Sequence, residues 1–388
     1  MMEHEEFALR KFVAPEFVFG IDARKLAGRY AKNFGARKVL VVTDPGVVSA
    51  GWTYDVLVFL REAGVEYAVF SSVTSNPKTE EVRAGAEIYQ REGCNAIVAV
   101  GGGSPMDCAK GIGIVSTNNL DILEFEGVDK VGLSTPPLIC IPTTAGSAAD
   151  VSQFAIITDV RRGVKFAIIS KMIVPDVALI DPVTTTTMPA ELTACTGMDV
   201  LCHAIEAFVS TAHSSITDLH ALQAIRLVME NLLPAIHEPD NMVLRGMMMQ
   251  ACLDAGLAFS NASLGMVHAM AHALGGLLDA PHGKCNAILL PYVIAFNYEE
   301  VPCRYGEIAK AMGLEVKGKA PAEVLSDIVS ALGRLNEAAG ISVSLGSLGV
   351  RRDVIPELAK KAMNDPCIYT NPRQPQLQDI ESIYEKAL

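Results

Sequence analysis

Four residues in the second half of the chain have the side-chain types that bind a divalent transition metal: Asp199, His203, His268 and His282. Asp199 and His203 are four residues apart in MDVLCHAIEAF, whose pattern predicts a helix, so their side chains share one helical face. His268 lies in a second predicted helix, MVHAMAHALGG, and His282 lies in a predicted turn directly after a proline. One carboxylate and three imidazoles can fill the inner coordination of such a metal and leave a position for a small ligand. If the four residues meet in space, the protein is a metalloenzyme.

Each of these residues also has an ordinary interpretation. A single histidine on a helix is more often a hydrogen-bonded core or surface residue, and an aspartate four residues before a histidine can be a simple helix pair. The combination favours a metal, because His268 and His272 also recur at a four-residue spacing among small apolar neighbours, and buried polar groups need partners. Cys202 and Cys285 lie beside the predicted ligands and offer soft sulfur donors. Both interpretations remain open from spacing alone.

The elements that must position these residues follow from hydrophobic patterning. The first 180 residues alternate short β-branched runs with helical patterns, which predicts a parallel sheet covered by helices. The predicted strands are residues 38–43, 66–70, 96–100 and 138–141, and the predicted helices are residues 23–33, 53–63, 80–91 and 105–116. A hairpin is predicted from residues 152–158 and 164–170, followed by a strand at residues 178–181. Beyond it the pattern is mostly helical, so we expect an α/β domain over residues 1–185 and an all-α domain over residues 186–388.

Composition and charge exclude several classes of protein. With 388 residues, 50% of them hydrophobic and 20% charged, the chain is expected to bury large cores. The net charge of −12 disfavours nucleic acid and an anionic membrane surface as partners, and there is no run of 18 consecutive apolar residues. The nine cysteines are irregularly spaced and the acidic N-terminus lacks the layout of a signal peptide, so we expect reduced thiols in a cytoplasmic protein.

Two loops at predicted strand ends have the composition of phosphate-binding turns. Residues 101–105 (GGGSP) allow close approach of a ligand to the backbone, with Ser104 as the predicted N-cap and Pro105 in the first helical turn. A helix N-terminus attracts phosphate, although this loop matches neither the GxGxxG fingerprint nor a P-loop. Residues 142–147 (PTTAGS) offer hydroxyls and backbone donors after the next strand. Two such loops favour a dinucleotide over ordinary strand-to-helix turns.

Asp44 ends the predicted strand in KVLVVTD and has two interpretations. Its carboxylate is placed to accept hydrogen bonds from ribose hydroxyls, which would favour NAD over NADP because it would repel a 2′-phosphate. Alternatively, it is a turn residue in the segment Asp44-Pro45-Gly46. The sequence supports the two interpretations about equally.

Longer motifs point to a family. GGGSPMDCAK (101–110), PTTAG (142–146), GMDVLCHAIE (197–206) and HAMAHALGGLLDAPHGKCNAILLP (268–291) resemble the iron-containing, or group III, alcohol dehydrogenases over nearly the whole chain. The resemblance implies a Rossmann-like N-terminal dinucleotide-binding domain and a helical C-terminal metal-binding domain, an architecture like that of dehydroquinate synthase. It implies hydride transfer between NAD(H) and a short-chain alcohol, aldehyde or diol with Fe(II) or, in some members, Zn(II). It also implies a homodimer or larger homo-oligomer.

The resemblance assigns roles to individual residues. Asp199, His203, His268 and His282 match the family's metal ligands. His272 matches a histidine near the nicotinamide, where we expect it either to relay the substrate proton or to pack against the ring. The matching cofactor positions are Gly102, Gly103 and Ser104 at the pyrophosphate, Thr143 and Thr144 at the second loop, Asp44 and Asn76 near the adenosine ribose, and Lys165 at the nicotinamide ribose. Ser152 is a further predicted cofactor residue.

One segment departs from the family pattern. Where the family continues PTTAG with Thr-Gly-Ser-Glu, this chain has Ser147-Ala148-Ala149-Asp150. The change removes a glycine, which restricts the loop, and it shortens an acidic side chain. We therefore expect altered contacts over residues 147–152, including those of Ser152, and an altered substrate preference.

Two other functions compete with alcohol dehydrogenation. A metal- and NAD-dependent lyase of the dehydroquinate synthase type would need clustered Lys and Arg for a polyanionic substrate, and around the predicted ligands only Lys284 is close in sequence. A non-catalytic cofactor-binding protein would have no need for four metal ligands. The sequence therefore favours a dehydrogenase.

Overall fold

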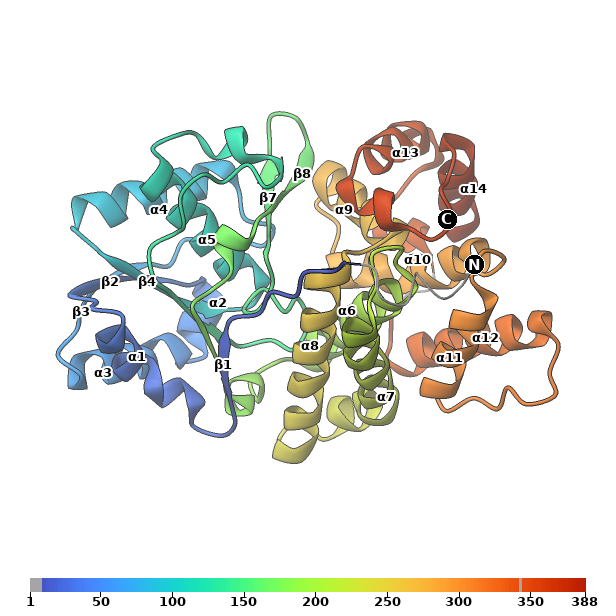
Figure 1. The fold of residues 1–388 in the computed structure, drawn as a ribbon, viewed down its shortest axis with the longest axis horizontal. Helices are drawn as coiled ribbons and strands as arrows, with labels where there is room; N and C mark the ends of the chain where they lie inside the picture. The colour runs from blue at the N-terminus through green and yellow to red at the C-terminus, as the bar shows by residue number, and fades with distance from the viewer. Residues whose placement is uncertain (1–8, 342–343) are drawn as a thin grey trace. The chain divides into compact units, whose positions relative to one another are not determined.

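The chain folds into two units, whose elements are labelled in Figure 1. The computed structural model describes residues 9–341 and 344–388. One unit comprises Val13–Met188 and contains both sheets. The other comprises Pro189–Leu388 together with residues 9–12.

The α/β unit is built on a six-stranded parallel sheet. In order across the sheet, its strands are β1 (Glu16–Phe19), β9 (Val177–Ile180), β6 (Leu138–Pro142), β4 (Ala96–Gly101), β2 (Lys38–Val42) and β3 (Glu66–Phe70). All five strands predicted for this sheet are present, and they pair in parallel. The sequence does not predict β1, because its four residues give little local signal and Glu16 pairs with Val177, far along the chain.

Helices cover both faces of this sheet and create two hydrophobic cores. The helices are η1 (Ala23–Leu26), α1 (Ala27–Asn33), α2 (Pro45–Ser49), α3 (Trp52–Glu62), α4 (Thr79–Arg91), α5 (Gly103–Asn118), η2 (Ile122–Phe125), η3 (Lys171–Ile173) and η4 (Pro182–Thr185). Leu40 and Val42 of β2 join one core with α4 and α5, and Val39 and Val41 join the other with α1 and α3. All four side chains are fully buried. Since successive residues point to opposite faces, a strand buried on both faces must be apolar throughout.

The strand order fixes where a ligand would bind this sheet. From β2 the chain goes outward to β3 and then returns past β2 to β4, so the order of the strands reverses between β2 and β4. In open α/β sheets, ligands bind beyond the carboxyl ends of the strands at such a reversal. The segments that follow these two strands contain Asp44 and residues 102–104.

A smaller sheet contains β5 (Gly127–Val128), β8 (Val164–Ile169) and β7 (Phe154–Asp159), in that order. β7 and β8 form the predicted hairpin, and they pair antiparallel from Phe154 opposite Ile169 to Asp159 opposite Val164. Asp159 stabilises the turn, because its Oδ1 accepts the backbone N–H of Arg161 at 2.9 Å.

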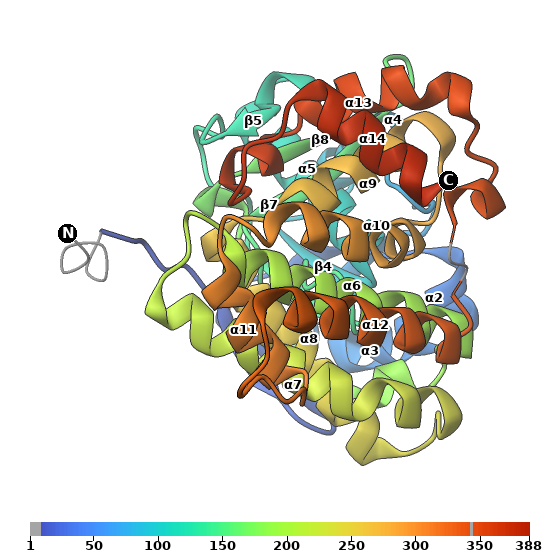
Figure 2. The same ribbon diagram turned by 90° about the vertical axis from the view of Figure 1, so that its right-hand side faces the viewer.

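The described part of the second unit is helical. Its α-helices are α6 (Ala190–Val209), α7 (Ser215–His237), α8 (Met242–Ala262), α9 (Met266–Leu278), α10 (His282–Asn297), α11 (Pro302–Ala311), α12 (Pro321–Ala338), α13 (Ile355–Met363) and α14 (Leu377–Ala387). Its 3-10 helices are η5 (Leu345–Leu348), η6 (Arg352–Val354) and η7 (Pro366–Thr370). α6 packs against α7, α8 and α10, and α9 packs against α10 (Figure 2).

α6 and α8 are the core helices of this unit. By length and composition alone both are apolar enough to cross a membrane, although neither contains 18 consecutive apolar residues. In the structure, 83% of the apolar window of α6 and 67% of that of α8 are buried. Gly197 lets α6 approach α7 closely, since a Cβ atom there would lie 2.3 Å from Cδ1 of Leu232.

Two predicted helix starts differ from the structure. α5 begins at Gly103 with Gly102 as its N-cap, so the prediction that Ser104 caps this helix is wrong. Gly102 has no side chain to accept a hydrogen bond, and the first N–H groups of α5 are left without a side-chain cap. His282, predicted in a turn, is the first residue of α10, and Pro281 is the N-cap.

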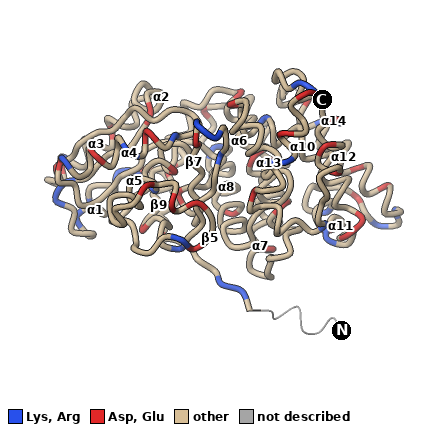
Figure 3. The backbone as a smooth tube through the Cα atoms, turned by 90° about the horizontal axis from the view of Figure 1, so that it is seen from above, with Lys and Arg blue, Asp and Glu red and all other residues tan. Residues whose placement is uncertain are grey.

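Charged residues of both signs are interspersed along both units, as Figure 3 shows. Most ion pairs are exposed, such as Arg83 with Asp121, and exposed pairs contribute little stability. A buried exception joins Arg24 to Asp181 at 2.6 Å and links η1 to the residue that follows β9.

Candidate metal centre and nucleotide-binding loops

Three of the predicted ligands converge in the helical unit. Asp199 comes from α6, His268 from α9 and His282 from the first turn of α10. One ligand atom of each lies within 4.8 Å of the other two. The Nε2 atoms of His268 and His282 are each 3.7 Å from Oδ1 of Asp199. The packing of three helices therefore gathers side chains that are distant in the sequence.

His203 lies beside this group, one helical turn after Asp199. Its ring stacks on that of His268, with the ring centroids 4.5 Å apart and 17° between the planes. It also stacks on Phe259, and only 4% of His203 is exposed. Its nitrogen atoms do not belong to the group of three within 4.8 Å, so its role as a fourth ligand remains a prediction.

The contacts of Asn286 indicate whether the group of Asp199, His268 and His282 fits a metal ion. Its side-chain nitrogen lies 2.6 Å from Oδ1 of Asp199, 3.1 Å from Nε2 of His268 and 3.2 Å from Nε2 of His282. An amide nitrogen carries two hydrogens and cannot satisfy three acceptors, whereas a divalent cation can bind all three. The carbonyl oxygen of Asn286 is buried without a hydrogen-bond partner among the described residues. The group of three therefore fits a divalent cation better than it fits this amide.

The electrostatics of the site favour the ionised form of Asp199. Burial would raise the pKa of Asp199, but positive charge on the imidazoles of His203, His282 and His268 outweighs burial and holds that pKa far below its ordinary value. The carboxylate is therefore ionised and available as a ligand. Oxygen and imidazole donors of this kind suit both Fe(II) and Zn(II).

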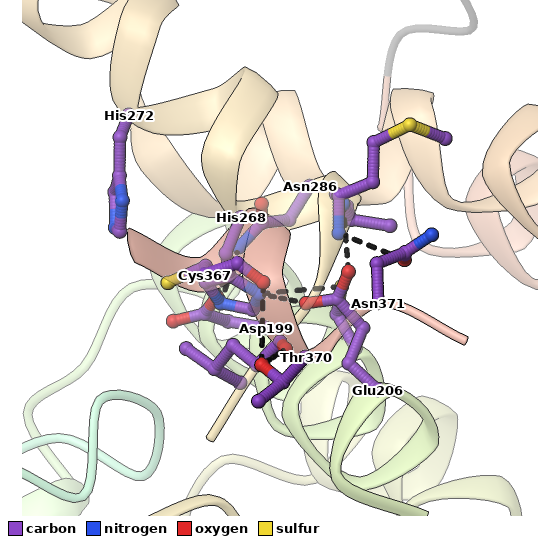
Figure 4. A network of polar contacts seen from close by, with 12 residues as sticks. Asp199, Glu206, His268, His272, Asn286, Cys367, Thr370 and Asn371 are labelled. Atoms are coloured by element: carbon purple, nitrogen blue, oxygen red, sulfur yellow. Dashed lines mark hydrogen bonds and ion pairs between the residues drawn. The ribbon is translucent and has the colours of Figure 1, made fainter. Parts of the chain in front are cut away.

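Glu206 orients His268 toward the other ligands. Nδ1 of His268 lies 2.6 Å from Oε2 of Glu206, in the network drawn in Figure 4. An ionised carboxylate can only accept, so Nδ1 carries the proton and Nε2 is left as a lone-pair donor facing Asp199. Cys202 is also on the Nδ1 side, with its sulfur 3.9 Å from that atom, rather than at the ligand group.

The same network holds the start of α9. Glu206 accepts the backbone N–H of Val267 through Oε1 at 2.7 Å. Asn371 accepts the N–H of Met266 at 3.1 Å, and its amide donates to Asn297 at 2.8 Å. These bonds satisfy N–H groups that a helix start leaves without intrahelical partners. They therefore fix the helix that carries His268.

Sequence reasoning did not identify Glu206, Asn286 or Asp365 at this site. For Glu206 a signal existed, because it follows Asp199 by seven residues and so lies on the same face of α6. Asn286 follows His282 by four residues in the same way. Asp365 gave no local signal, since it bonds His272 from 93 residues away.

His272 is buried one turn after His268 on α9. Its ring stacks on that of His282, with the centroids 5.4 Å apart and 11° between the planes. Its Nδ1 lies 2.8 Å from Oδ2 of Asp365. Figure 4 shows it on the same helix as His268, to one side of the polar network.

The glycine loop begins α5 at the strand reversal of the α/β unit. Gly103 and Ser104 are the first two residues of this 16-residue helix. Their N–H groups are orphan donors, and the helix dipole adds positive potential there. Asp44 follows the neighbouring strand and caps α2, with Oδ1 accepting the N–H of Val47 at 2.9 Å. The capping interpretation of Asp44 therefore has a structural basis, while ribose binding remains a prediction.

The threonine loop touches the glycine loop. The N–H of Thr143 donates to the carbonyl of Gly101 at 2.9 Å. A Cβ atom at Gly102 would lie 3.0 Å from Oγ1 of Thr144, and one at Gly103 would lie 2.9 Å from Cβ of Ser147. Both glycines thus let the two loops approach each other without displacing these side chains.

Two further predicted cofactor residues meet each other. Nζ of Lys165, on β8, donates to Oδ1 of Asn76 at 2.6 Å. Asn76 has a φ of 56°, a left-handed conformation that asparagine tolerates better than most residues. The bond joins the hairpin to the segment before α4, so the structure brings together two residues that are far apart in the sequence.

Ser152 is held by a buried lysine that sequence reasoning missed. Nζ of Lys110, on α5, donates to the carbonyl oxygens of Ser152 at 2.8 Å and Phe154 at 2.6 Å. Lys110 is fully buried, and burial lowers the pKa of its ammonium despite the nearby carboxyl groups of Asp107 and, to a smaller extent, Asp150. The ammonium therefore fixes the backbone from Ser152 to the start of β7.

The segment that departs from the family pattern is constrained. Ala148 has a φ of 49°, in the left-handed region that glycine occupies without strain. Asp150 is only 5% exposed, and burial raises its pKa to about 6. The expected restriction of this loop thus appears as a strained alanine.

Both units match family models of one enzyme class. Residues 14–182 match iron-containing alcohol dehydrogenase, and residues 193–388 match the C-terminal part of the Fe-containing alcohol dehydrogenase family. The chain belongs to the iron-containing alcohol dehydrogenase family, which confirms the resemblance of its motifs. It is therefore an oxidoreductase.

Relatives and solved structures cover nearly the whole chain. It is 41% identical over 371 residues to 1,3-propanediol dehydrogenase from Klebsiella pneumoniae, covering 95% of this chain and 96% of the relative. It is 38% identical to NAD-dependent methanol dehydrogenase from Bacillus methanolicus, covering 97% and 99%. A crystal structure of 1,3-propanediol oxidoreductase is similar with a TM-score of 0.95 and 40% identity, covering 98% and 100%. The predicted combination of an α/β unit and a helical unit is confirmed.

Proposed function

We propose that this enzyme transfers a hydride between NAD(H) and a short-chain alcohol, diol or aldehyde with the help of a divalent metal ion. The metal proposed first is Fe(II). In the oxidative direction the alcohol loses a hydride to NAD and a proton to solvent, which gives an aldehyde and NADH. The observation that carries the proposal is the convergence of Asp199, His268 and His282 on one point occupied by the Asn286 amide. The named relatives act on 1,3-propanediol and methanol, which supports small alcohols as the substrate class.

The metal would be held by Asp199, His268 and His282, with His203 as the fourth ligand. A divalent cation there would act as a Lewis acid toward an alcohol or carbonyl oxygen. The task of the protein is to keep the ligand atoms ionised or deprotonated and pointed inward. Glu206 does this for His268.

The α/β unit would bind NAD at the reversal of its strand order. The N–H groups at the start of α5 and the hydroxyls of Thr143 and Thr144 would bind the pyrophosphate region. Lys165 and Asn76, which are bonded to each other, would bind hydroxyls of the same ribose rather than of two different ones, and Ser152, held by Lys110, would also contact the cofactor. Asp44 would favour NAD over NADP, because a carboxylate repels a 2′-phosphate.

His272 would accept the proton that the alcohol loses. Since its Nδ1 lies at hydrogen-bond distance from a carboxylate, its Nε2 is the atom that can receive a proton. The alternative is that the ring only packs against the nicotinamide. A His272→Gln variant that kept the wild-type turnover would exclude proton transfer through this residue.

We further propose that the enzyme is cytoplasmic and that it forms a homodimer or larger homo-oligomer. All nine cysteines lie in the described part of the chain and none of them forms a disulfide there, as expected of a reducing compartment.

The test is a panel of short alcohols, diols and aldehydes assayed with NAD(H) on protein reconstituted separately with Fe(II) and Zn(II). We expect steady accumulation of NADH with at least one short alcohol or diol, and loss of activity in metal-free protein. Transient cofactor reduction without net NADH would instead indicate a lyase. Equal activity in metal-free protein would contradict the proposal.

A further inference from the structure

A second carboxylate–imidazole pair lies beside the proposed metal centre. His272, on α9, is 6% exposed, and Asp365, which precedes η7, is 8% exposed. Oδ2 of Asp365 lies 2.8 Å from Nδ1 of His272. The other oxygen, Oδ1, accepts the backbone N–H of Cys367 at 2.8 Å. The two oxygens of one carboxylate therefore serve two different partners.

The pair fixes the protonation pattern of the imidazole. Oδ2 of Asp365 faces Nδ1 of His272, while Oδ1 is already used as an acceptor by the N–H of Cys367. An ionised carboxylate can only accept hydrogen bonds, so Nδ1 must carry the hydrogen. In the neutral ring, Nε2 is then left with its lone pair.

The surroundings also fix the orientation of the ring. One face of His272 stacks on His282, with 11° between the planes. With that face covered and Nδ1 bonded, rotation of the ring would break both contacts. The position of Nε2 of His272 is therefore fixed relative to His282 and Asp365.

We propose that Asp365 is a positioning residue of the hydride-transfer reaction, which holds His272 in the tautomer and orientation that let Nε2 accept the substrate proton. The inference rests on the proposed role of His272. The proton passes from the alcohol oxygen to Nε2 and then to solvent, while the hydride passes to NAD, so charge and atoms balance. Asp365 itself does not take up the proton.

The alternative is that Asp365 only caps η7, and the two roles use different oxygens. Asp365→Asn separates them, because the Asn carbonyl oxygen can still accept the N–H of Cys367. The new amide nitrogen would donate to Nδ1 of His272 and move the ring hydrogen to Nε2. A cap role predicts normal turnover in this variant, whereas a positioning role predicts slow turnover by folded enzyme.

The experiment compares wild type, Asp365→Asn, His272→Gln and the double variant as metal-loaded full-length enzymes. We expect Asp365→Asn to lower kcat at least about tenfold, given the usual contribution of a positioned base. KM for NAD and the metal content should stay within about twofold of wild type, as expected when only the reacting step is affected. The double variant should be no slower than His272→Gln, because Asp365 acts through that ring.

A matched control exists in the same unit. His220 and Asp254 form the same kind of pair, with Nδ1 2.7 Å from Oδ1, and neither belongs to the proposed site. Asp254→Asn should keep the wild-type kcat. If Asp365→Asn fails to fold, Asp365→Ser retains a capping hydroxyl, is too short to reach the imidazole, and should show the same loss of kcat.

The outcomes separate this inference from the proposed function. Normal kcat in Asp365→Asn together with slow His272→Gln would overturn the role of Asp365 and leave that of His272 intact. Normal kcat in His272→Gln would overturn both. A double variant much slower than His272→Gln would show that Asp365 acts other than through the imidazole.

Discussion

Glu206 contacts His268 on the side away from the ligand group, so a change there alters the ligand without removing it. Glu206→Gln would let an amide donate to Nδ1 of His268 and would place the ring hydrogen on Nε2, where it opposes metal binding. We expect metal affinity about 10–100-fold weaker than in wild type. Competition with a chelator measures it directly.

The control for this variant is Glu191→Gln. Glu191 is on the same helix, but its side chain is 73% exposed and pairs with Lys284 at the surface. The Glu191→Gln variant should retain the wild-type metal affinity. Equal affinities in the Glu206 and Glu191 variants would contradict the orienting role of Glu206.

At the residue scale, the sequence could predict candidate ligands, three of which the structure brings together, but not the residues that support them. Asp199, His203, His268 and His282 stand out because carboxylate and imidazole side chains are unusual in apolar helices. Asn286 is an ordinary amide until three helices pack and place it at the convergence point. The φ of Ala148 could be anticipated only as a restriction of the loop, because backbone conformation depends on the surrounding contacts.

At the scale of elements, the metal centre depends on how closely α10 approaches α6. Gly283 follows His282, and a Cβ atom there would lie 2.4 Å from the backbone carbonyl oxygen of Cys195. Backbone cannot move aside as a flexible side chain can. We expect Gly283→Ala to destabilise the protein by about 1–3 kcal/mol, or roughly 3–10 °C in Tm, and to weaken metal binding.

Gly306→Ala is the comparison for this variant. Gly306 lies in α11, and a Cβ atom added there would meet only open space. Alanine there should stabilise the helix by up to about 1 kcal/mol. Thermal unfolding of both variants tests the expectation, and a Gly283→Ala variant as stable as Gly306→Ala would refute the close approach of α10 and α6.

Elements were predictable where their signal is local. The buried strands and the β7–β8 hairpin have continuous apolar runs or a turn sequence, and they appear close to the predicted bounds. β1 and the start of α5 were not predictable in the same way. β1 forms by pairing with β9, which is distant in the sequence. α5 begins at Gly103, two residues earlier than it would with Ser104 as its N-cap, because the glycine backbone fits the turn.

At the scale of the whole molecule, the buried Asp150 makes stability depend on pH. Its pKa is about 6 in the folded protein, against about 3.9 in an unfolded chain. The folded state therefore binds this proton more tightly, so stability falls as pH rises from about 4 to about 6 and stays lower above that range. Asp150→Asn removes this effect and should be more stable than wild type at pH 7.5, by up to about 3 kcal/mol.

Thermal unfolding across this pH range provides the measurement. The advantage of Asp150→Asn should vanish below about pH 4, where the wild-type carboxyl is protonated in both states. Asp129→Asn serves as the control, because Asp129 is exposed and its φ of 54° suits asparagine. If Asp150→Asn were more stable than wild type by the same amount at every pH, the raised pKa of the buried Asp150 carboxyl would be contradicted.

The metal content of the purified protein tests the central claim most directly. Full-length wild type reconstituted with Fe(II) or Zn(II) should retain about one ion per chain after desalting, as a site of three or four protein ligands does. His282→Ala removes the most exposed of the three converging ligands, with 28% of its side chain accessible, and should lose the ion while remaining folded. His237→Ala, at an exposed helix end, should keep it. Equal metal content in His282→Ala and His237→Ala would contradict the account.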